Sequence, residues 1–198
     1  MKLLVIGRTG QVAQALLEPA PADITLVAKG RPELDILNTA SIAAALDLDA
    51  PDLVINARSI PLIHISTDYV FDGASDRPYR EDDPVSPLGV YGRSKLEGEH
   101  AVAALNPQHL IVRTAWVYSP VGKNFVKTML RLAADREEVS VVSDQIGNPT
   151  SAHALAEALL QMARRVTQQP DASLFGTYHA SGTGEASWAD LAEHVFAV

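Results

Sequence analysis

A tyrosine and a lysine four residues apart are the first pair in this sequence that could do chemistry. Tyr91 and Lys95 stand at i and i+4, so on a helix they share one face. A lysine ammonium beside a phenol favours the phenolate and lowers the pKa of the phenol. Such a tyrosine can act as the general acid for a carbonyl that is being reduced, or as the base in the reverse direction. Surface pairs often have the same spacing, so the surrounding residues must decide between the two interpretations.

Hydroxyl side chains end an apolar run upstream of this pair. The run over 63–67 closes with Ser66 and Thr67, and Asp68 follows. In α/β proteins ligands bind at the carboxyl edge of the sheet, where such strand ends gather. We therefore expect Ser66 and Thr67 to be able to donate a hydrogen bond to a carbonyl oxygen. Capping of the following loop is the alternative role for these hydroxyls.

A glycine turn near the N-terminus predicts a dinucleotide site. Gly7, Gly10 and Ala13 are spaced G-x-x-G-x-x-A between an apolar run and a helical pattern. The glycines let the backbone approach a pyrophosphate, and the helix N-terminus favours its negative charge. An ordinary strand-to-helix turn can have the same pattern.

Cations follow the second predicted strand, where an acidic residue would bind the ribose of NAD. Lys29 and Arg31 stand there, and Arg8 lies in the first turn. Positive charge suits a 2′-phosphate, so the sequence favours NADP(H). The alternative is that Lys29 and Arg31 are solvated loop charges.

Strands that alternate with helices must position these residues. This order predicts an α/β fold with a Rossmann-like, doubly wound parallel sheet. We expect a dinucleotide-binding domain over 1–147 and a smaller, incomplete substrate-side region over 148–198. The expected strands are 2–6, 24–28, 52–56, 62–66, 109–113 and 139–142, and the expected helices begin near 15, 39, 94, 124, 152 and 187.

One connection conflicts with this fold. Only residues 57–61 separate the strand ending at Asn56 from the strand beginning near Leu62. Neighbouring parallel strands need a crossover of roughly a dozen or more residues. We therefore expect that residues are missing between 57 and 60. The chain also stops at Val198 in a helical pattern without a cap, which suggests a missing C-terminal part.

Composition excludes several classes of protein. The net charge of −8 argues against a protein that binds nucleic acid non-specifically. The sequence has no cysteine, and it has neither a transmembrane run nor a signal peptide pattern. We expect a cytoplasmic protein without a membrane or nucleic-acid partner.

Longer motifs give a specific resemblance. The stretches LVIGRTGQVA, PDLVINA, STDYVFDG, PVSPLGVYGRSKLEGE, RTAWVY, NFVKTML and SDQIGNPTSA follow one another along the chain. In this order they resemble the dTDP-4-dehydrorhamnose reductase family of the extended short-chain dehydrogenases/reductases. STDYVFDG and DQIGNPT are far more specific than the glycine turn or the Tyr–Lys pair. The family also has a tyrosine–threonine turn and a crossover helix after the third strand, and this sequence lacks both.

The resemblance implies a set of site residues. The catalytic residues of the family fall on Thr67, Tyr91 and Lys95. Substrate contacts fall on Thr67, Asp68 and Trp116, although Trp116 could also be a core residue. The stretch 144–150 could line the substrate side or be a structural loop. Cofactor contacts fall on Gly7, Gly10, Gln11, Val12, Lys29, Asp35, Ile36, Asn56, Ala57, Ile65, Tyr91 and Lys95.

The resemblance also implies a reaction. Family members reduce the C4 keto group of dTDP-6-deoxy-L-lyxo-4-hexulose (dTDP-4-dehydrorhamnose) to dTDP-L-rhamnose, with hydride from NADPH or NADH. A homodimer and a Mg²⁺ ion also occur in the family, but the sequence does not reveal ligands for the ion. Two alternatives remain open: another epimerase or dehydratase of nucleotide sugars, and a non-catalytic NADP-binding regulatory subunit of methionine adenosyltransferase.

Overall fold

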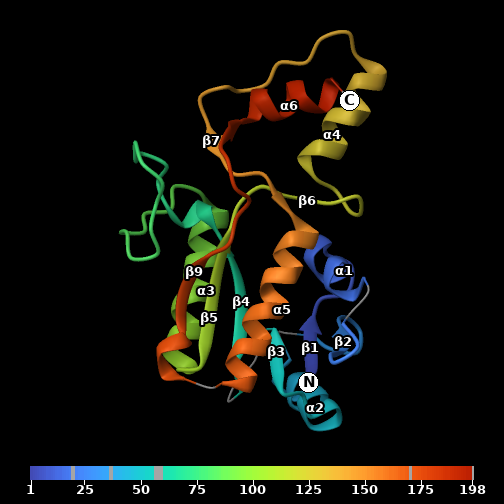
Figure 1. The fold of residues 1–198 in the computed structure, drawn as a ribbon, viewed down its shortest axis with the longest axis vertical. Coiled ribbons are helices and arrows are strands. Elements are labelled where there is room, and N and C mark those ends of the chain that lie inside the picture. Colours follow the sequence, from blue (N-terminus) through green and yellow to red (C-terminus); the bar gives the residue numbers. More distant parts are fainter. Residues whose placement is uncertain (19–20, 36–37, 56–59, 170, 198) are drawn as a thin grey trace.

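A six-stranded parallel sheet forms the centre of the protein, in the order β2-β1-β3-β4-β5-β9 (Figure 1). The computed structural model describes residues 1–18, 21–35, 38–55, 60–169 and 171–197. The pairs of neighbouring strands all run parallel within this sheet. Its strands are β1 (Lys2–Ile6), β2 (Thr25–Lys29), β3 (Leu53–Ile55), β4 (Leu62–Thr67), β5 (His109–Thr114) and β9 (Gly176–His179).

Helices cover both faces of this sheet. On one face, α1 (Gln11–Leu17) and α5 (Ala152–Gln168) pack with Leu3 and Val5 in the main core cluster. On the other face, Leu4 and Val54 form a second cluster with α2 (Thr39–Asp49), and α3 (Val90–Leu105) covers β4. The doubly wound fold expected from the sequence is therefore confirmed.

A smaller lobe stands beyond the carboxyl ends of the strands (Figure 1). In it, α4 (Phe125–Asp135) packs against α6 (Trp188–Phe196) around Met129, Ala192 and Val195. Two stretches separated in sequence build this lobe. Between them in the chain, α5 packs on one face of the sheet and β9 forms its edge strand. The lobe and its base also contain β6 (Val117–Tyr118), β7 (Ile146–Gly147), β8 (Thr150–Ser151) and β10 (Ala186–Ser187), and the 3₁₀ turns η1 (Asp68–Val70) and η2 (Ala172–Leu174) lie elsewhere.

Two strand predictions differ from the structure. The expected strand over 139–142 is wrong: Val139 and Val141 pack beside the α4–α6 cluster, but the segment has no strand partner. Apolar alternation therefore reflects burial against helices here. The sixth strand, β9, was not expected, because it has only four residues and includes Gly176.

The link between β3 and β4 is as short as the sequence indicates. The two strands are parallel neighbours, with Val54 opposite Leu62. The amide of Val54 donates to the Pro61 carbonyl over 3.3 Å, and Asn106 Nδ2 donates to the Ile60 carbonyl over 3.0 Å. The β3–β4 pair thus forms with residues 56–61 as its only connection, of which 56–59 lie outside the described residues.

Candidate active site

Helix α3 carries the tyrosine–lysine pair at its N-terminal end. The helix begins at Val90, one turn earlier than expected, so Tyr91 and Lys95 both lie on it. Lys95 Nζ donates to the Ile65 carbonyl over 2.8 Å, which joins the helix to β4. Burial lowers the pKa of the Lys95 ammonium, and the carboxylate of Glu99 acts in the opposite direction. Tyr91 is 59% exposed as a residue, so it lies at the surface of the protein.

The carboxyl end of β4 meets the start of this helix. Thr67, which is buried, donates through Oγ1 to Asp68 Oδ1 over 3.0 Å. Burial raises the pKa of the Asp68 carboxyl. The Tyr69 ring stands edge-on to the Tyr91 ring, with centroids 5.9 Å apart. The structure therefore brings Thr67, Asp68 and Tyr91 to one place at the carboxyl edge of the sheet.

A glycine permits this contact. A Cβ atom at Gly92 would lie 2.1 Å from the Tyr69 carbonyl oxygen. Only glycine can occupy such a site without moving the backbone of η1 away from the helix.

The structure turns Ser66 away from this edge. Its hydroxyl is buried and donates to Glu99 Oε1 on α3 over 2.5 Å. Because side chains alternate along a strand, Thr67 points to the other face. The expectation that Ser66 could donate to a substrate carbonyl is wrong, while Thr67 remains a candidate.

The glycine turn has the space that a pyrophosphate needs. Gly7 has a φ of +118°, and its amide donates to the Lys29 carbonyl over 2.8 Å. A Cβ atom at Gly7 or Gly10 would meet no atom within 4 Å. Gly10 is the N-cap of α1 and provides no side-chain cap for the amides of the first turn. These features fit the diphosphate of a dinucleotide.

Two neighbours of this turn differ in their surroundings. The Gln11 side chain accepts a hydrogen bond from Asn124 Nδ2 over 3.0 Å, so it links α1 to the start of α4. Val12 packs against the main core cluster. For both residues the backbone is therefore the part that a cofactor would meet first.

The cations expected near the 2′-phosphate each contact a carboxylate. Lys29 Nζ lies 2.5 Å from Asp49 Oδ2 and is mostly buried. Arg8 contacts Glu33 over 3.0 Å, and its side chain is 54% exposed. Arg31 pairs with Asp35 over 3.2 Å and is 70% exposed. The two arginines are thus accessible at the surface, whereas Lys29 is occupied on the face covered by α2.

Three of the expected cofactor residues, Ile36, Asn56 and Ala57, lie outside the described residues. Asp35, next to Ile36, is half-buried, and its amide donates to Ser41 Oγ over 2.9 Å. Ile65 lies on β4, partly buried against the main core, and its carbonyl holds Lys95.

Trp116 belongs to an aromatic pair that the sequence did not reveal. Its ring stacks on Trp188 of α6 with centroids 3.5 Å apart. Gly147 lies against the same indole, where a Cβ atom would come within 2.5 Å of it. The Thr150 amide donates to the Trp116 carbonyl over 3.2 Å. The stretch 144–150 therefore borders Trp116, which connects the sheet to the smaller lobe.

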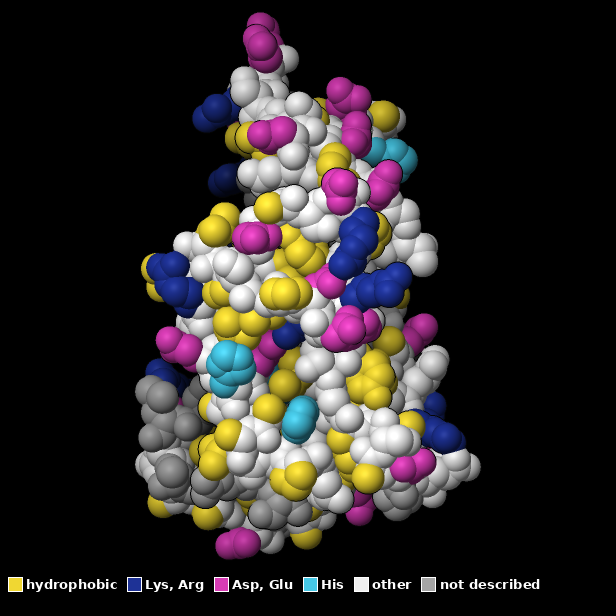
Figure 2. Space-filling view, turned by 90° about the vertical axis from the view of Figure 1, so that its left-hand side faces the viewer, with side chains coloured by type: hydrophobic (Ala, Val, Ile, Leu, Met, Phe, Trp, Pro, Cys, Tyr) yellow, Lys and Arg dark blue, Asp and Glu magenta, His cyan; other side chains and the backbone are white. Residues whose placement is uncertain are grey.

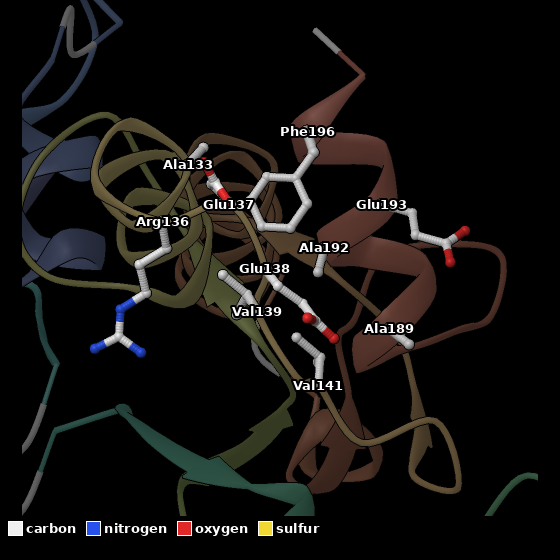
Figure 3. A pocket seen from close by; sticks show the side chains of 10 residues that line it. All are labelled: Ala133, Arg136, Glu137, Glu138, Val139, Val141, Ala189, Ala192, Glu193 and Phe196. Atoms are coloured by element: carbon white, nitrogen blue, oxygen red, sulfur yellow. The ribbon is translucent and has the colours of Figure 1, made fainter.

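A hollow in the smaller lobe offers less chemistry. It lies between α4 and α6, and the side chains of Val139, Val141, Ala192 and Phe196 surround it (Figure 3). The charged residues that line it are three glutamates, Glu137, Glu138 and Glu193, and one arginine, Arg136; this balance disfavours a phosphate group.

The described residues contain no cluster of three or more His, Cys, Asp or Glu side chains that could hold a metal ion. Among the described helices, none is both long and apolar enough to cross a membrane.

Known proteins resemble this chain over nearly its whole length. The family model for the RmlD substrate binding domain matches residues 1–59 and 55–198. A dTDP-4-dehydrorhamnose reductase of Sinorhizobium fredii is 43% identical, and the match covers 100% of this chain and 78% of that protein.

Solved structures agree with these matches. A Bacillus anthracis dTDP-4-dehydrorhamnose reductase in complex with NADP aligns with a TM-score of 0.90 and 32% identity, over 99% of this chain and 79% of the other. A Clostridium acetobutylicum dTDP-4-dehydrorhamnose reductase aligns with a TM-score of 0.89 and 33% identity, over 100% and 80% of the two chains.

The alignments also show how this chain differs in length. The match to the Sinorhizobium protein spans 231 aligned positions, whereas this chain has 198 residues, a difference of 33. The family model matches this chain in two segments, which overlap at residues 55–59, at the end of β3.

Proposed function

This chain belongs to the RmlD substrate binding domain family, and we infer that it is an NADP-dependent reductase acting on dTDP-4-dehydrorhamnose. The observation that supports this inference is the packing of the start of α3, which carries Tyr91 and Lys95, against the end of β4 and η1. This packing includes the hydrogen bond from Lys95 to the Ile65 carbonyl and the contact of the Tyr69 and Tyr91 rings. The names of the relatives support the reductase over the epimerase, the dehydratase and the regulatory subunit.

The proposed reaction is reduction of the C4 keto group of dTDP-6-deoxy-L-lyxo-4-hexulose. When bound, the nicotinamide supplies the hydride. Tyr91 donates a proton to the oxygen that becomes the alcohol. Lys95, fixed on the Ile65 carbonyl, stabilises the resulting phenolate. The Thr67 hydroxyl, which donates to Asp68 in the free protein, would turn its proton to the same oxygen, where negative charge develops.

NADPH is the cofactor that this proposal favours over NADH. The Bacillus anthracis relative is named as an NADP complex. In this chain, Arg8 is exposed in the glycine turn, and its side chain lies against Gly30 at the end of β2. We place the 2′-phosphate beside Arg8, and the diphosphate over Gly7 and Gly10, with Gln11 and Val12 facing it through their backbone.

The substrate side is assigned to the smaller lobe and the residues below it. Asp68 and Trp116 face this side in our proposal, together with the stretch 144–150. The substrate side in this proposal is therefore not one stretch over 148–198, because α4, which lies before residue 147, packs against α6 in the smaller lobe. We further propose that the relatives carry a longer crossover after β3, which accounts for most of the 33 additional positions.

An activity assay tests the proposed function. The protein is mixed with NADPH and dTDP-6-deoxy-L-lyxo-4-hexulose, NADPH oxidation is followed, and the sugar product is identified. We expect dTDP-L-rhamnose. A matched reaction with dTDP-4-keto-6-deoxy-D-glucose tests the sugar: turnover of this isomer alone would retain the reductase but reject the assigned substrate. NAD that stays bound through purification, with no net oxidation, would instead indicate an epimerase.

A further inference from the structure

A buried charged cluster lies directly behind the proposed catalytic residues. Glu99 of α3 is 3% exposed, and Arg113 of β5 is 7% exposed. Arg113 Nη2 donates to Glu99 Oε2 over 2.7 Å, and Arg113 Nε donates to both carboxylate oxygens over 3.1 and 3.3 Å. The Ser66 hydroxyl also donates to Oε1. The carboxylate is therefore held from both β4 and β5.

The position of this cluster relates it to the reaction. Glu99 follows Lys95 by one helical turn, and Ser66 follows Ile65 along β4. Two adjacent hydrogen bonds thus join α3 to the end of β4, one from Lys95 to the Ile65 carbonyl and one from Ser66 to Glu99. The helix that carries Tyr91 is fixed by these bonds relative to Thr67, the next residue of the strand.

We propose that Glu99 is a positioning residue for the reduction, which holds Lys95 and the start of α3 against the end of β4. This proposal rests on the proposed function, since it assigns Glu99 a role in that reaction. A buried ion pair is a costly way to add stability, because both charges lose their hydration. Because Glu99 lies one helical turn from Lys95, its negative charge also acts on the Lys95 ammonium.

The charges around Lys95 indicate what this effect is. Burial lowers the pKa of Lys95, and Glu99 on the same helix raises it. From β4, His64 faces the lysine, and burial lowers the pKa of this histidine, which favours its neutral form. Arg113 neutralises part of the Glu99 charge from the other side. Glu99 therefore helps to keep Lys95 protonated, and loss of its charge would make Lys95 lose its proton at lower pH.

Two variants test this role. Glu99→Gln removes the charge and keeps the shape, and Glu99→Gln combined with Arg113→Met avoids leaving the arginine buried without a counter-ion. We expect a fall in kcat of roughly tenfold or more with a smaller change in KM for NADPH. The alkaline limb of the pH profile, measured both as kcat/KM and as NADPH affinity, should move to lower pH, because the charge that raises the pKa of Lys95 is lost.

Matched variants separate this role from a structural one. Glu97→Gln makes the same change at an exposed site of α3 and should leave the profile unchanged. Glu99→Asp keeps the charge and should restore the alkaline limb even where the rate stays low. If folded Glu99→Gln, alone or with Arg113→Met, keeps the alkaline limb of the unchanged protein, the proposal is overturned. If the unchanged protein reduces no dTDP sugar, the proposed function fails, and the NADPH affinity profile alone decides the role of Glu99.

Discussion

At the scale of single residues, Tyr91 offers the most direct test of the chemistry. Tyr91→Phe removes the proposed proton donor, while Lys95 keeps its bond to the Ile65 carbonyl. We expect kcat to fall by roughly 10²- to 10⁴-fold, the usual contribution of a general acid. NADPH affinity, measured by fluorescence titration, should stay nearly unchanged. Tyr118→Phe is the control, and an unaltered rate in Tyr91→Phe would reject the assignment.

The choice between NADPH and NADH depends on a different residue. Arg8 is exposed between the glycine turn and the end of β2, whereas Lys29 is paired with Asp49. Arg8→Ala should raise KM for NADPH roughly tenfold and leave KM for NADH nearly the same, because only NADPH has the 2′-phosphate. Lys29→Ala should instead lower the stability and spare this preference. Equal effects of Arg8→Ala on both cofactors would place the 2′-phosphate elsewhere.

Side-chain partners explain which site residues the sequence could reveal. Thr67, Asp68, Tyr91 and Lys95 lie in short motifs, so their proximity could be predicted from one strand end and one helix. The ion pair of Glu99 with Arg113 could not be predicted, because Arg113 comes from β5, a strand that follows α3 in the chain. The stacking of Trp116 on Trp188 likewise joins residues far apart in the chain.

At the scale of elements, the close approach of α3 to η1 is the sensitive contact. Gly92→Ala would bring a Cβ atom within 2.1 Å of the Tyr69 carbonyl oxygen, so the helix or the turn must move. We expect a loss of about 1–3 kcal/mol in the free energy of unfolding, as for other overpacked sites. Because Tyr91 moves with the helix, kcat should fall as well.

The same helix contains a control glycine. A Cβ atom at Gly98 would lie 3.4 Å from the end of the His64 side chain. Alanine favours a helix over glycine by about 1 kcal/mol, so Gly98→Ala should be neutral or stabilising. Denaturant unfolding of both variants tests this. Equal losses at the two sites would mean that the α3–η1 contact is not the cause.

Elements with long apolar patterns could be predicted from the sequence, and short ones could not. β1 has the expected bounds, and α2 and α4 begin at Thr39 and Phe125, at or next to the expected starts. β9 has four residues, and its strand character comes from pairing with β5. The segment over 139–142 shows the opposite case, because its valines alternate but lie beside helices.

At the scale of the whole molecule, the surface carries exposed hydrophobic side chains beside the proposed active site. Figure 2 shows hydrophobic side chains over the middle and lower part of one face, with both acidic and basic side chains around them. The large hydrophobic residues exposed between 69 and 91 are Tyr69, Leu88, Val90 and Tyr91. In the proposed function, an apolar surface beside Tyr91 suits the ring faces of a nucleotide sugar, whereas the net charge of −8 disfavours binding to nucleic acid or to an anionic membrane.

The short β3–β4 link determines the last prediction. α2 leads from β2 across β1 to β3, and α3 leads from β4 to its neighbour β5. Both connections run in the same direction along the sheet, and both helices lie on one face. A right-handed β3–β4 crossover would lie on that face as well. Helix α2 exposes several apolar residues: Ala40, Ala43, Ala44 and Leu48 are exposed together with Asp47, although its other side is buried. A helix of this kind is usually covered on more than one side.

Restoring a crossover should therefore stabilise this protein. We would insert the additional segment of the Sinorhizobium relative within residues 55–59, where the two matched segments overlap. A Gly/Ser segment of equal length is the control, and it should cost about 1.7 kcal/mol from loop closure alone. The native segment should instead raise the free energy of unfolding, increase the denaturant m-value through newly buried surface, and tighten NADPH binding. A chimera no more stable than the Gly/Ser control would show that the sheet is complete with its six-residue link.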